Sequence, residues 1–126
     1  MARFDPGVVL IVDDNVDTNE ALATILEYRG YDPVSAYDGH DALCRLRSGL
    51  RPSVIVLDLA MPNVDGRTFL REIMTDGRLS GIPVVVHSAR LDGVPLYGVA
   101  ACVAKGQHPD VLLTIIGSLC PHHLVS

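Results

Sequence analysis

The sequence predicts a doubly wound α/β fold, in which helices cover both faces of a parallel β-sheet. Short runs rich in β-branched residues lie at 8–12, 54–57 and 84–86, a pattern typical of strands buried on both faces of such a sheet. Segments with helical spacing of apolar residues alternate with these runs, which indicates βαβ units with right-handed crossovers. The chain has 126 residues, the size of one domain.

Two weaker apolar runs, at residues 33–36 and 100–103, complete an expected sheet of five strands. Apolar residues at helical spacing mark the helices. The first helix contains Leu22 and Leu26 and ends at Gly30, where a glycine can stop it. The others are expected around residues 42–46, 69–73 and 112–119.

The connection between the last two strands is too short for an ordinary helix. Only twelve residues, 88–99, lie between His87 and Ala100, close to the minimum for a βαβ crossover. Gly93, Pro95 and Gly98 also lie there, and these residue types are poor in helix interiors. We therefore expect the fourth helix of the fold to be shortened or missing.

Composition excludes several classes of function. Fifteen acidic and ten basic residues give a net charge of −5, so we expect no nucleic-acid or membrane partner. The three cysteines form no Cys-x-x-Cys pair, which favours reduced thiols and a cytoplasmic location. No apolar run approaches the roughly 18 residues of a membrane span.

Polar residues follow the expected strands, at the edge where open parallel sheets bind ligands. Asp13 and Asp14 follow the first strand, and Asp58 lies at the end of the third. Ser88 follows the fourth strand and Lys105 follows the fifth. Taken alone, each has an ordinary explanation as a cap, a turn residue or a surface side chain. Together they would place three carboxylates, a hydroxyl and an ammonium at one edge.

Crowded carboxylates suggest a bound cation. Two like charges about 4 Å apart repel by about 4 kcal/mol at an effective dielectric of 20, and oxygen ligands favour Mg²⁺. With Mg²⁺ in place, one carboxylate could attack a phosphoryl group. The ammonium and the hydroxyl could then stabilise the phosphoryl oxygens.

The sequence resembles the receiver domain of bacterial two-component response regulators, and in particular the chemotaxis-type single-domain regulators. The resemblance runs from about residue 7 to about residue 119, so we expect residues 1–126 to form a single receiver domain with this core. It is carried by VLIVDDN at 9–15, YDGHDAL at 37–43, DLAMPNVDG at 58–66 and VVVHSA at 84–89. The resemblance implies a flavodoxin-like five-stranded sheet with strand order 2-1-3-4-5.

The resemblance also implies a role for each residue at the sheet edge. Asp58 would be the phosphoacceptor, and Asp13, Asp14, Asp58 and the backbone carbonyl of Ala60 would hold Mg²⁺, with Asp13 acting mainly through water. Ser88 would be the switch hydroxyl and Lys105 would bind a phosphoryl oxygen. The phosphoryl group would come from a phosphohistidine on a sensor histidine kinase or a histidine phosphotransfer protein.

The chain departs from the family pattern at three places. From Ser88 to Lys105 it advances 17 positions (105 − 88), fewer than is usual. Cys102 stands where the family carries an aromatic switch residue, and Gly106 stands where a proline usually follows the lysine. Because a cis bond before a non-proline residue costs about 2.5–4 kcal/mol, we expect a trans peptide after Lys105.

These observations predict a phosphoacceptor receiver domain that is not a turnover enzyme. A phosphatase of the haloacid dehalogenase type would need a second acid two residues after Asp58, where Ala60 stands. The alternative is an unphosphorylated pseudo-receiver that acts as a docking module.

The last helix has an unusual composition, because residues 111–119 include no charged side chain. Surface helices normally have a polar face. We therefore expect a homodimer or a partner domain to dock on this helix through Leu112, Leu113 and Ile116. The competing expectation is that these residues fill the space left by the short fourth helix.

Overall fold

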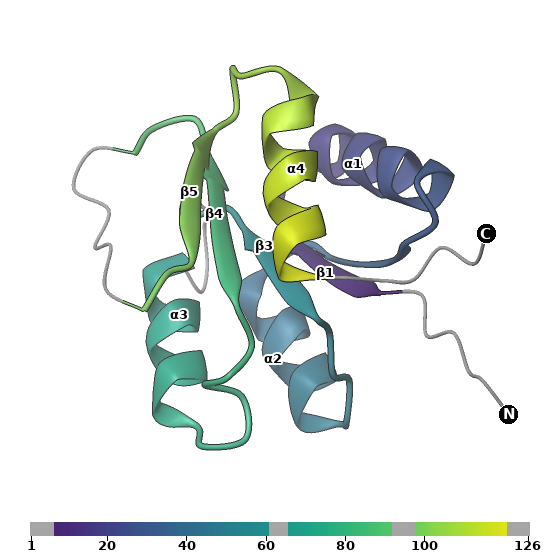
Figure 1. Ribbon diagram of the computed structural model, residues 1–126. Coiled ribbons are helices and arrows are strands. Elements are labelled where there is room, and N and C mark those ends of the chain that lie inside the picture. Colours follow the sequence, from purple (N-terminus) through teal and green to yellow (C-terminus); the bar gives the residue numbers. More distant parts are fainter. Residues whose placement is uncertain (1–6, 61–65, 92–97, 121–126) are drawn as a thin grey trace, which may run out of the picture.

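The computed structural model describes residues 7–60, 66–91 and 98–120. In these residues one sheet of five parallel strands has the order β2-β1-β3-β4-β5, which confirms the predicted fold class and strand order. The strands are β1 (Val8–Val12), β2 (Asp32–Ala36), β3 (Val54–Leu57), β4 (Val84–Ser88) and β5 (Ala101–Ala104). Figure 1 shows them in one twisted layer.

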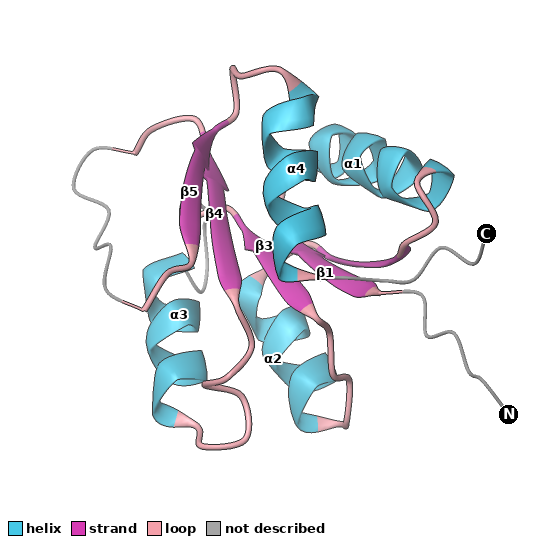
Figure 2. Ribbon diagram, in the orientation of Figure 1, coloured by secondary structure: helices cyan, strands magenta, loops and turns pink. Residues whose placement is uncertain are grey.

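Four helices lie in the described residues and cover both faces of the sheet. They are α1 (Val16–Tyr28), α2 (Gly39–Arg47), α3 (Gly66–Thr75) and α4 (Pro109–Leu119). Helices α1 and α4 lie on one face, and α2 and α3 on the other (Figures 1 and 2). None of these helices has both the length and the apolar character needed to cross a membrane.

The hydrophobic core consists of two clusters, one on each face of the sheet. Leu46, Phe69 and Ile73 from α2 and α3 pack against the strands on one face. Leu26 and Ile116 from α1 and α4 pack on the other face. The central strands contribute to both clusters because successive side chains point to opposite faces. This double burial explains why the β-branched runs at 8–12, 54–57 and 84–86 are almost continuous.

Local side-chain chemistry sets the ends of the first two helices. The Asn15 side chain accepts a hydrogen bond from the Thr18 backbone N–H at the start of α1, and Asp38 accepts one from Asp41 at the start of α2. Gly30 and Gly49 follow these helices with φ of 90° and 118°, a conformation that favours glycine. The predicted stop at Gly30 is therefore confirmed.

The connection from β4 to β5 contains no helix in the described residues 89–91 and 98–100. This agrees with the expectation of a shortened or missing helix. Gly93 and Pro95, on which that expectation partly depended, lie outside the described residues. At Gly98 the value of φ is 79°, and an added Cβ would collide with the side chain of Met74. The positive φ therefore favours a glycine where the chain turns back toward β5.

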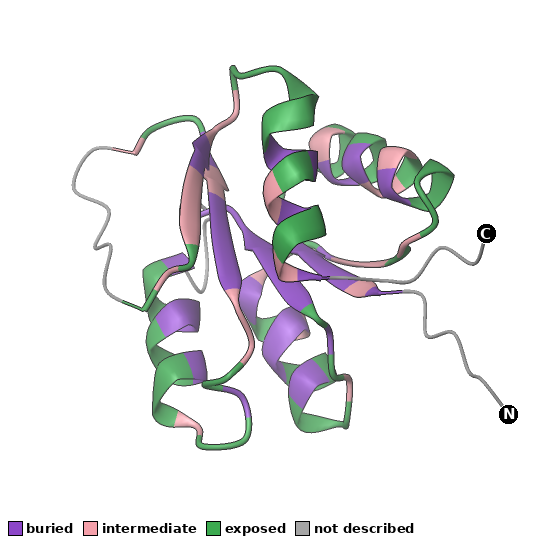
Figure 3. Ribbon diagram, in the orientation of Figure 1, coloured by how far each residue is buried: buried purple, intermediate pink, exposed green. Residues whose placement is uncertain are grey.

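The structure contradicts the proposed docking role of three residues in the last helix. Leu112, Leu113 and Ile116 are buried against the sheet and α1, with exposed fractions of 3%, 6% and 0%. Their apolar character serves the core, as the inward face of α4 in Figure 3 shows. The helix packs on the opposite face of the sheet from α3. That a homodimer or a partner domain forms at all remains a prediction.

Candidate functional site

Three carboxylates meet at the carboxyl end of the sheet. Asp13 follows β1, and Asp58 follows the neighbouring strand β3; the Asp58 backbone N–H donates to the Val12 carbonyl at 2.9 Å. One side-chain oxygen from each of Asp13, Asp14 and Asp58 lies within 4.8 Å of the others. Asp13 and Asp58 are buried, whereas Asp14 is exposed. The site is therefore a half-buried acidic cluster with one open side.

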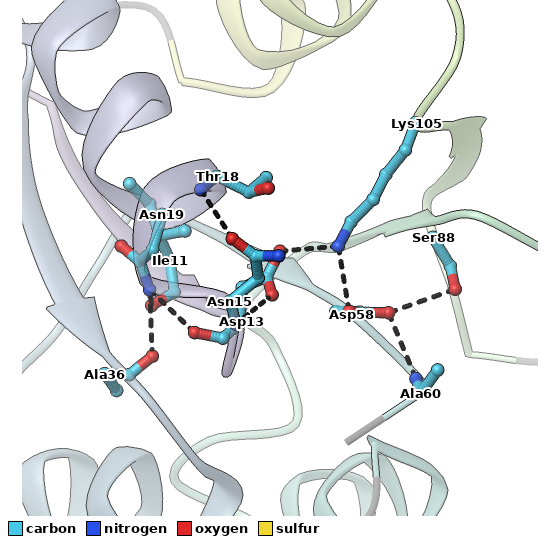
Figure 4. Close-up of polar contacts among 10 residues, drawn as sticks. All are labelled: Ile11, Asp13, Asn15, Thr18, Asn19, Ala36, Asp58, Ala60, Ser88 and Lys105. Carbon is cyan, nitrogen blue, oxygen red and sulfur yellow. Dashed lines mark hydrogen bonds and ion pairs between the residues drawn. The ribbon is translucent and has the colours of Figure 1, made fainter.

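Lys105 bridges the two buried carboxylates (Figure 4). Its Nζ lies 2.9 Å from Asp13 Oδ2 and 3.0 Å from Asp58 Oδ2. Burial alone would lower the pKa of Lys105, but the hydrogen bonds and charges of Asp13 and Asp58 outweigh burial and raise the pKa. The side chain therefore stays an ammonium and balances part of the negative charge.

Asp58 receives two further hydrogen bonds through its other oxygen. The Ser88 hydroxyl and the Ala60 backbone N–H each donate to Asp58 Oδ1 at 3.0 Å. The Ser88 side chain is almost fully buried, and the Lys105 backbone N–H donates to the Ser88 carbonyl at 3.0 Å. The predicted site residues Asp13, Asp14, Asp58, Ser88 and Lys105 are thus brought together. Ala60 adjoins them through its N–H; the metal-binding role predicted for its carbonyl remains a prediction.

Sequence reasoning missed a buried asparagine that supports the site. Asn19 is fully buried in α1, and its Nδ2 lies 3.1 Å from the Asp13 and Ala36 carbonyls and 3.4 Å from that of Ile11. One amide therefore ties α1 to the ends of β1 and β2 (Figure 4). The sequence signal was a polar residue on the inward face of the helix, one turn before Leu22.

The acidic cluster fits a hard divalent cation. Three carboxylates outnumber the single ammonium, so the cluster keeps an excess of negative charge that such an ion would neutralise. Two oxygens bound to one Mg²⁺ are at most about 4.2 Å apart, and the three carboxylates approach this spacing. Small side-chain rotations would bring the three carboxylate oxygens to the spacing that Mg²⁺ requires, with Lys105 released from at least one carboxylate.

The departures from the family pattern are visible beside the site. Cys102 on β5 is partly buried against the cluster that includes α2 and α3, and burial raises the pKa of its thiol. The Lys105–Gly106 peptide bond is trans, as expected. Lys105 nevertheless reaches Asp58, so the absence of proline does not prevent this contact.

Two cavities flank the site. One, of about 410 Å³, is lined by Leu59, Ala60, Arg67, Ser88, Ala89 and Arg90. The other, of about 240 Å³, lies between α1 and α4 and includes Lys105 and His87 in its wall. Burial, followed by the charge of Lys105, lowers the pKa of His87. Sequence reasoning did not single out Arg67 or Arg90, because neither directly follows a strand.

Comparison with known proteins identifies the family. The family model described as the response regulator receiver domain matches residues 9–116. The chain therefore belongs to the response regulator receiver domain family, which confirms the resemblance noted from its motifs.

Individual relatives agree with this assignment. The DNA-binding response regulator MtrA of Mycobacterium tuberculosis is 36% identical over 86 residues, covering 68% of this chain and 36% of that protein. The chain thus spans about a third of the length of this curated relative. A response regulator receiver protein from Pseudomonas putida has a TM-score of 0.83 and 27% identity, covering 94% of this chain and 99% of that one.

A third similar protein is the phosphorylated cyanobacterial phytochrome response regulator RcpA. Its solved structure has a TM-score of 0.75 and 28% identity, and the match covers 90% of each chain.

Proposed function

We propose that this receiver domain accepts a phosphoryl group on Asp58, with Mg²⁺ held by Asp13, Asp14, Asp58 and the Ala60 carbonyl. The observation that carries the proposal is the set of donors around Asp58. The Ser88 hydroxyl, the Ala60 N–H and the Lys105 ammonium all lie 3.0 Å from its carboxylate oxygens. Donors placed in this way can bind the oxygens of a group attached to that carboxylate.

The chemistry is a transfer between two acceptors. An Asp58 oxygen attacks the phosphorus, the bond from phosphorus to the donor breaks, and its electron pair leaves with the donor. The donor is a phosphohistidine on a sensor histidine kinase or a histidine phosphotransfer protein. When bound, Mg²⁺ would neutralise negative charge as the phosphoryl group approaches the acids. Lys105 neutralises a further charge, and Ser88 donates a hydrogen bond to the new group.

Phosphorylation of a similar protein supports this reading. RcpA, which shares 28% identity with this chain, was solved in a phosphorylated form. The DNA binding named for MtrA is not proposed for this chain, because the match covers 36% of that protein. We place the reaction in the cytoplasm, consistent with Cys44, Cys102 and Cys120 all being free thiols.

We infer that the product is a signal and not a turnover intermediate. Ala60 stands two residues after Asp58, where a phosphatase of the haloacid dehalogenase type would place a second acid. The competing function is an unphosphorylated pseudo-receiver that docks a partner. The donors grouped around Asp58 favour the phosphoacceptor, because docking alone does not require them.

Intact mass after incubation with acetyl phosphate and Mg²⁺ tests the phosphoacceptor role. We expect one added phosphoryl group in the wild type and none in Asp58→Asn, which keeps the shape of the side chain but removes the nucleophile. An unmodified wild type, with Mg²⁺ binding verified, would favour the pseudo-receiver. Labelling of Asp58→Asn at the wild-type rate would show that another residue is the acceptor.

Calorimetric titration tests the metal site. Asp14→Ala should weaken Mg²⁺ binding at least severalfold and slow phosphorylation, because this exposed carboxylate can exchange water for the ion directly. Asp17→Ala is the matched control, since Asp17 is an acidic residue in the first turn of α1, outside the cluster. Equal Mg²⁺ affinity in Asp14→Ala and the wild type would remove Asp14 from the metal site.

A further inference from the structure

A histidine and a cysteine form an exposed pair on helix α2, outside the acidic cluster. His40 and Cys44 are four residues apart in this helix, so their side chains are neighbours on one face. Cys44 Sγ lies 3.8 Å from His40 Nε2, and both residues are exposed. The core contacts of α2 come from other positions, which include Leu43 and Leu46. The packing of the helix therefore does not account for this pair.

The spacing of the two side chains fits one metal ion. A tetrahedral Zn²⁺ site has Zn–S bonds of about 2.3 Å and Zn–N bonds of about 2.0–2.1 Å, which place the sulfur and nitrogen about 3.6 Å apart. The 3.8 Å between Cys44 Sγ and His40 Nε2 is close to this value. Thiolate and imidazole are also the ligands that Zn²⁺ prefers. The pair could therefore bind such an ion with little rearrangement.

The charges beside the pair do not oppose a cation. Arg45 Nε lies 3.2 Å from an Asp41 carboxylate oxygen, and Arg47 Nη2 lies 3.4 Å from a Glu72 carboxylate oxygen. Each arginine next to Cys44 in the sequence pattern is thus paired with a carboxylate. The positive charge that would repel an ion from the thiol is balanced locally.

One chain supplies only half of a tetrahedral site. In the part of the chain that the structure describes, Asp13, Asp14 and Asp58 are the only group of three or more potential metal ligands. No third His, Cys, Asp or Glu side chain of the described residues therefore joins His40 and Cys44. A second copy related by a two-fold axis would present the same pair. Two thiolates would then balance the two charges of the ion.

We propose that His40 and Cys44 from two copies of this chain together bind one ion of the Zn²⁺ class, which joins the copies through the exposed faces of α2. Each Cys44 thiol loses its proton to solvent as its sulfur binds the ion. The step transfers no electrons and needs no other reactant. The proposal does not depend on phosphorylation, because the phosphoacceptor site shares neither residue.

Sedimentation during a Zn²⁺ titration tests this site in the wild type, His40→Gln, Cys44→Ser and the double variant. Excess Mg²⁺ competes for the acidic cluster, and a phosphine reductant keeps the thiols reduced without adding a sulfur ligand. Cys102→Ser is the control, since it removes a different free thiol, on β5. Co²⁺ in place of Zn²⁺ adds a second readout, because thiolate bound to Co²⁺ gives a charge-transfer absorption band.

We expect Zn²⁺ to raise the dimer fraction of the wild type, with one ion bound per two chains, and a chelator to reverse the change. Loss of a direct ligand should weaken Zn²⁺ binding by more than the roughly tenfold that loss of a supporting partner costs. Cys44→Ser should also lose the charge-transfer band, whereas Cys102→Ser should match the wild type.

Two results would overturn the proposal. One is a wild type that binds one ion per chain and does not associate, which would exclude the shared site. The other is a double variant with the same Zn²⁺ response and Co²⁺ spectrum as the wild type, which would place the ion elsewhere. Both variants replace exposed side chains of similar size, so circular dichroism should show an unchanged fold. Either result would leave the proposed phosphoacceptor role of Asp58 intact.

Discussion

Replacing Lys105 with methionine removes the ammonium that joins two buried carboxylates. Lys105 Nζ is 2.9 Å from Asp13 and 3.0 Å from Asp58, whose exposed fractions are 3% and 4%. Methionine keeps most of the length of the side chain but carries no charge. We expect Lys105→Met to lower the free energy of unfolding at pH 7 without Mg²⁺, and Mg²⁺ to restore much of the loss.

The size of the effect follows from the spacing of the acids. Their oxygens lie within 4.8 Å of one another, and two unit charges at that distance repel by about 3.5 kcal/mol at an effective dielectric of 20. The site is open on the side of Asp14, so water screens part of this repulsion. We therefore expect Lys105→Met to lose about 2–3 kcal/mol of unfolding free energy.

Urea denaturation with and without Mg²⁺ measures this difference. Because the pKa of Lys105 is raised above its ordinary 10.5, its stabilising effect is complete below pH 10.5 and is lost only as pH rises through the raised value. At pH 7 the wild type therefore has the full contribution. Arg78→Met is the control, since Arg78 makes an exposed 3.8 Å ion pair and should change stability by under about 1 kcal/mol.

The response to Mg²⁺ supplies the decisive comparison. A cation that binds only the folded state stabilises it, and the stabilisation increases with the affinity. Lys105 competes with that cation for the same oxygens. Mg²⁺ should therefore stabilise Lys105→Met more than the wild type. Equal stability of the two proteins without Mg²⁺, or equal gains with it, would refute the bridging role of Lys105.

Two further predictions concern His87 and Leu113. Burial lowers the pKa of His87 below 6.5, so the unfolded chain binds a proton more readily than the native chain. The contribution of the neutral His87 ring to the free energy of unfolding is complete above pH 6.5. It is lost as pH falls toward the lowered pKa, by at most about 1.4 kcal/mol per pH unit. His87→Gln should reduce the change in denaturation midpoint between pH 7.5 and 5.5. An unchanged dependence of the midpoint on pH would contradict a lowered pKa for His87. Leu113→Glu should cost about 3 kcal/mol or more, because it places a charge at a 6% exposed core position. A fully stable Leu113→Glu protein that loses only self-association in sedimentation would restore the docking role of α4.

The fold could be predicted from the sequence because its central strands are buried on both faces. The runs at 8–12 and 54–57 match β1 and β3 residue for residue. The edge strands were less clear: β5 is Ala101–Ala104, one residue later than expected, since an edge strand has fewer neighbours to fix its pattern. The site residues could be grouped because each was expected at the carboxyl end of a parallel strand, and these ends meet at one edge of the sheet.

Side-chain orientation could not be predicted in the same way. Asp13 and Asp14 are adjacent and chemically identical, yet only Asp13 is buried and paired with Lys105. The apolar stretch of α4 suggested a docking surface, but its burial depends on the distant side chains Leu22 and Leu26. The cavity lined by Arg67 and Arg90 depends on the packing of α3 beside β4 and has no local sequence pattern.

The hydrogen bond from Ser88 to Asp58 limits the signal that this hydroxyl can carry. It donates to the carboxylate at 3.0 Å. Phosphorylation would therefore exchange one charge-assisted bond for another, and a bound group shifts a conformational equilibrium only by the difference in its interactions with the two states. A difference of about 1 kcal/mol would change the ratio of conformers about fivefold. If Asp58 is phosphorylated as proposed, we expect most of the bias toward an active state to come from the added charge and from its attraction to Lys105.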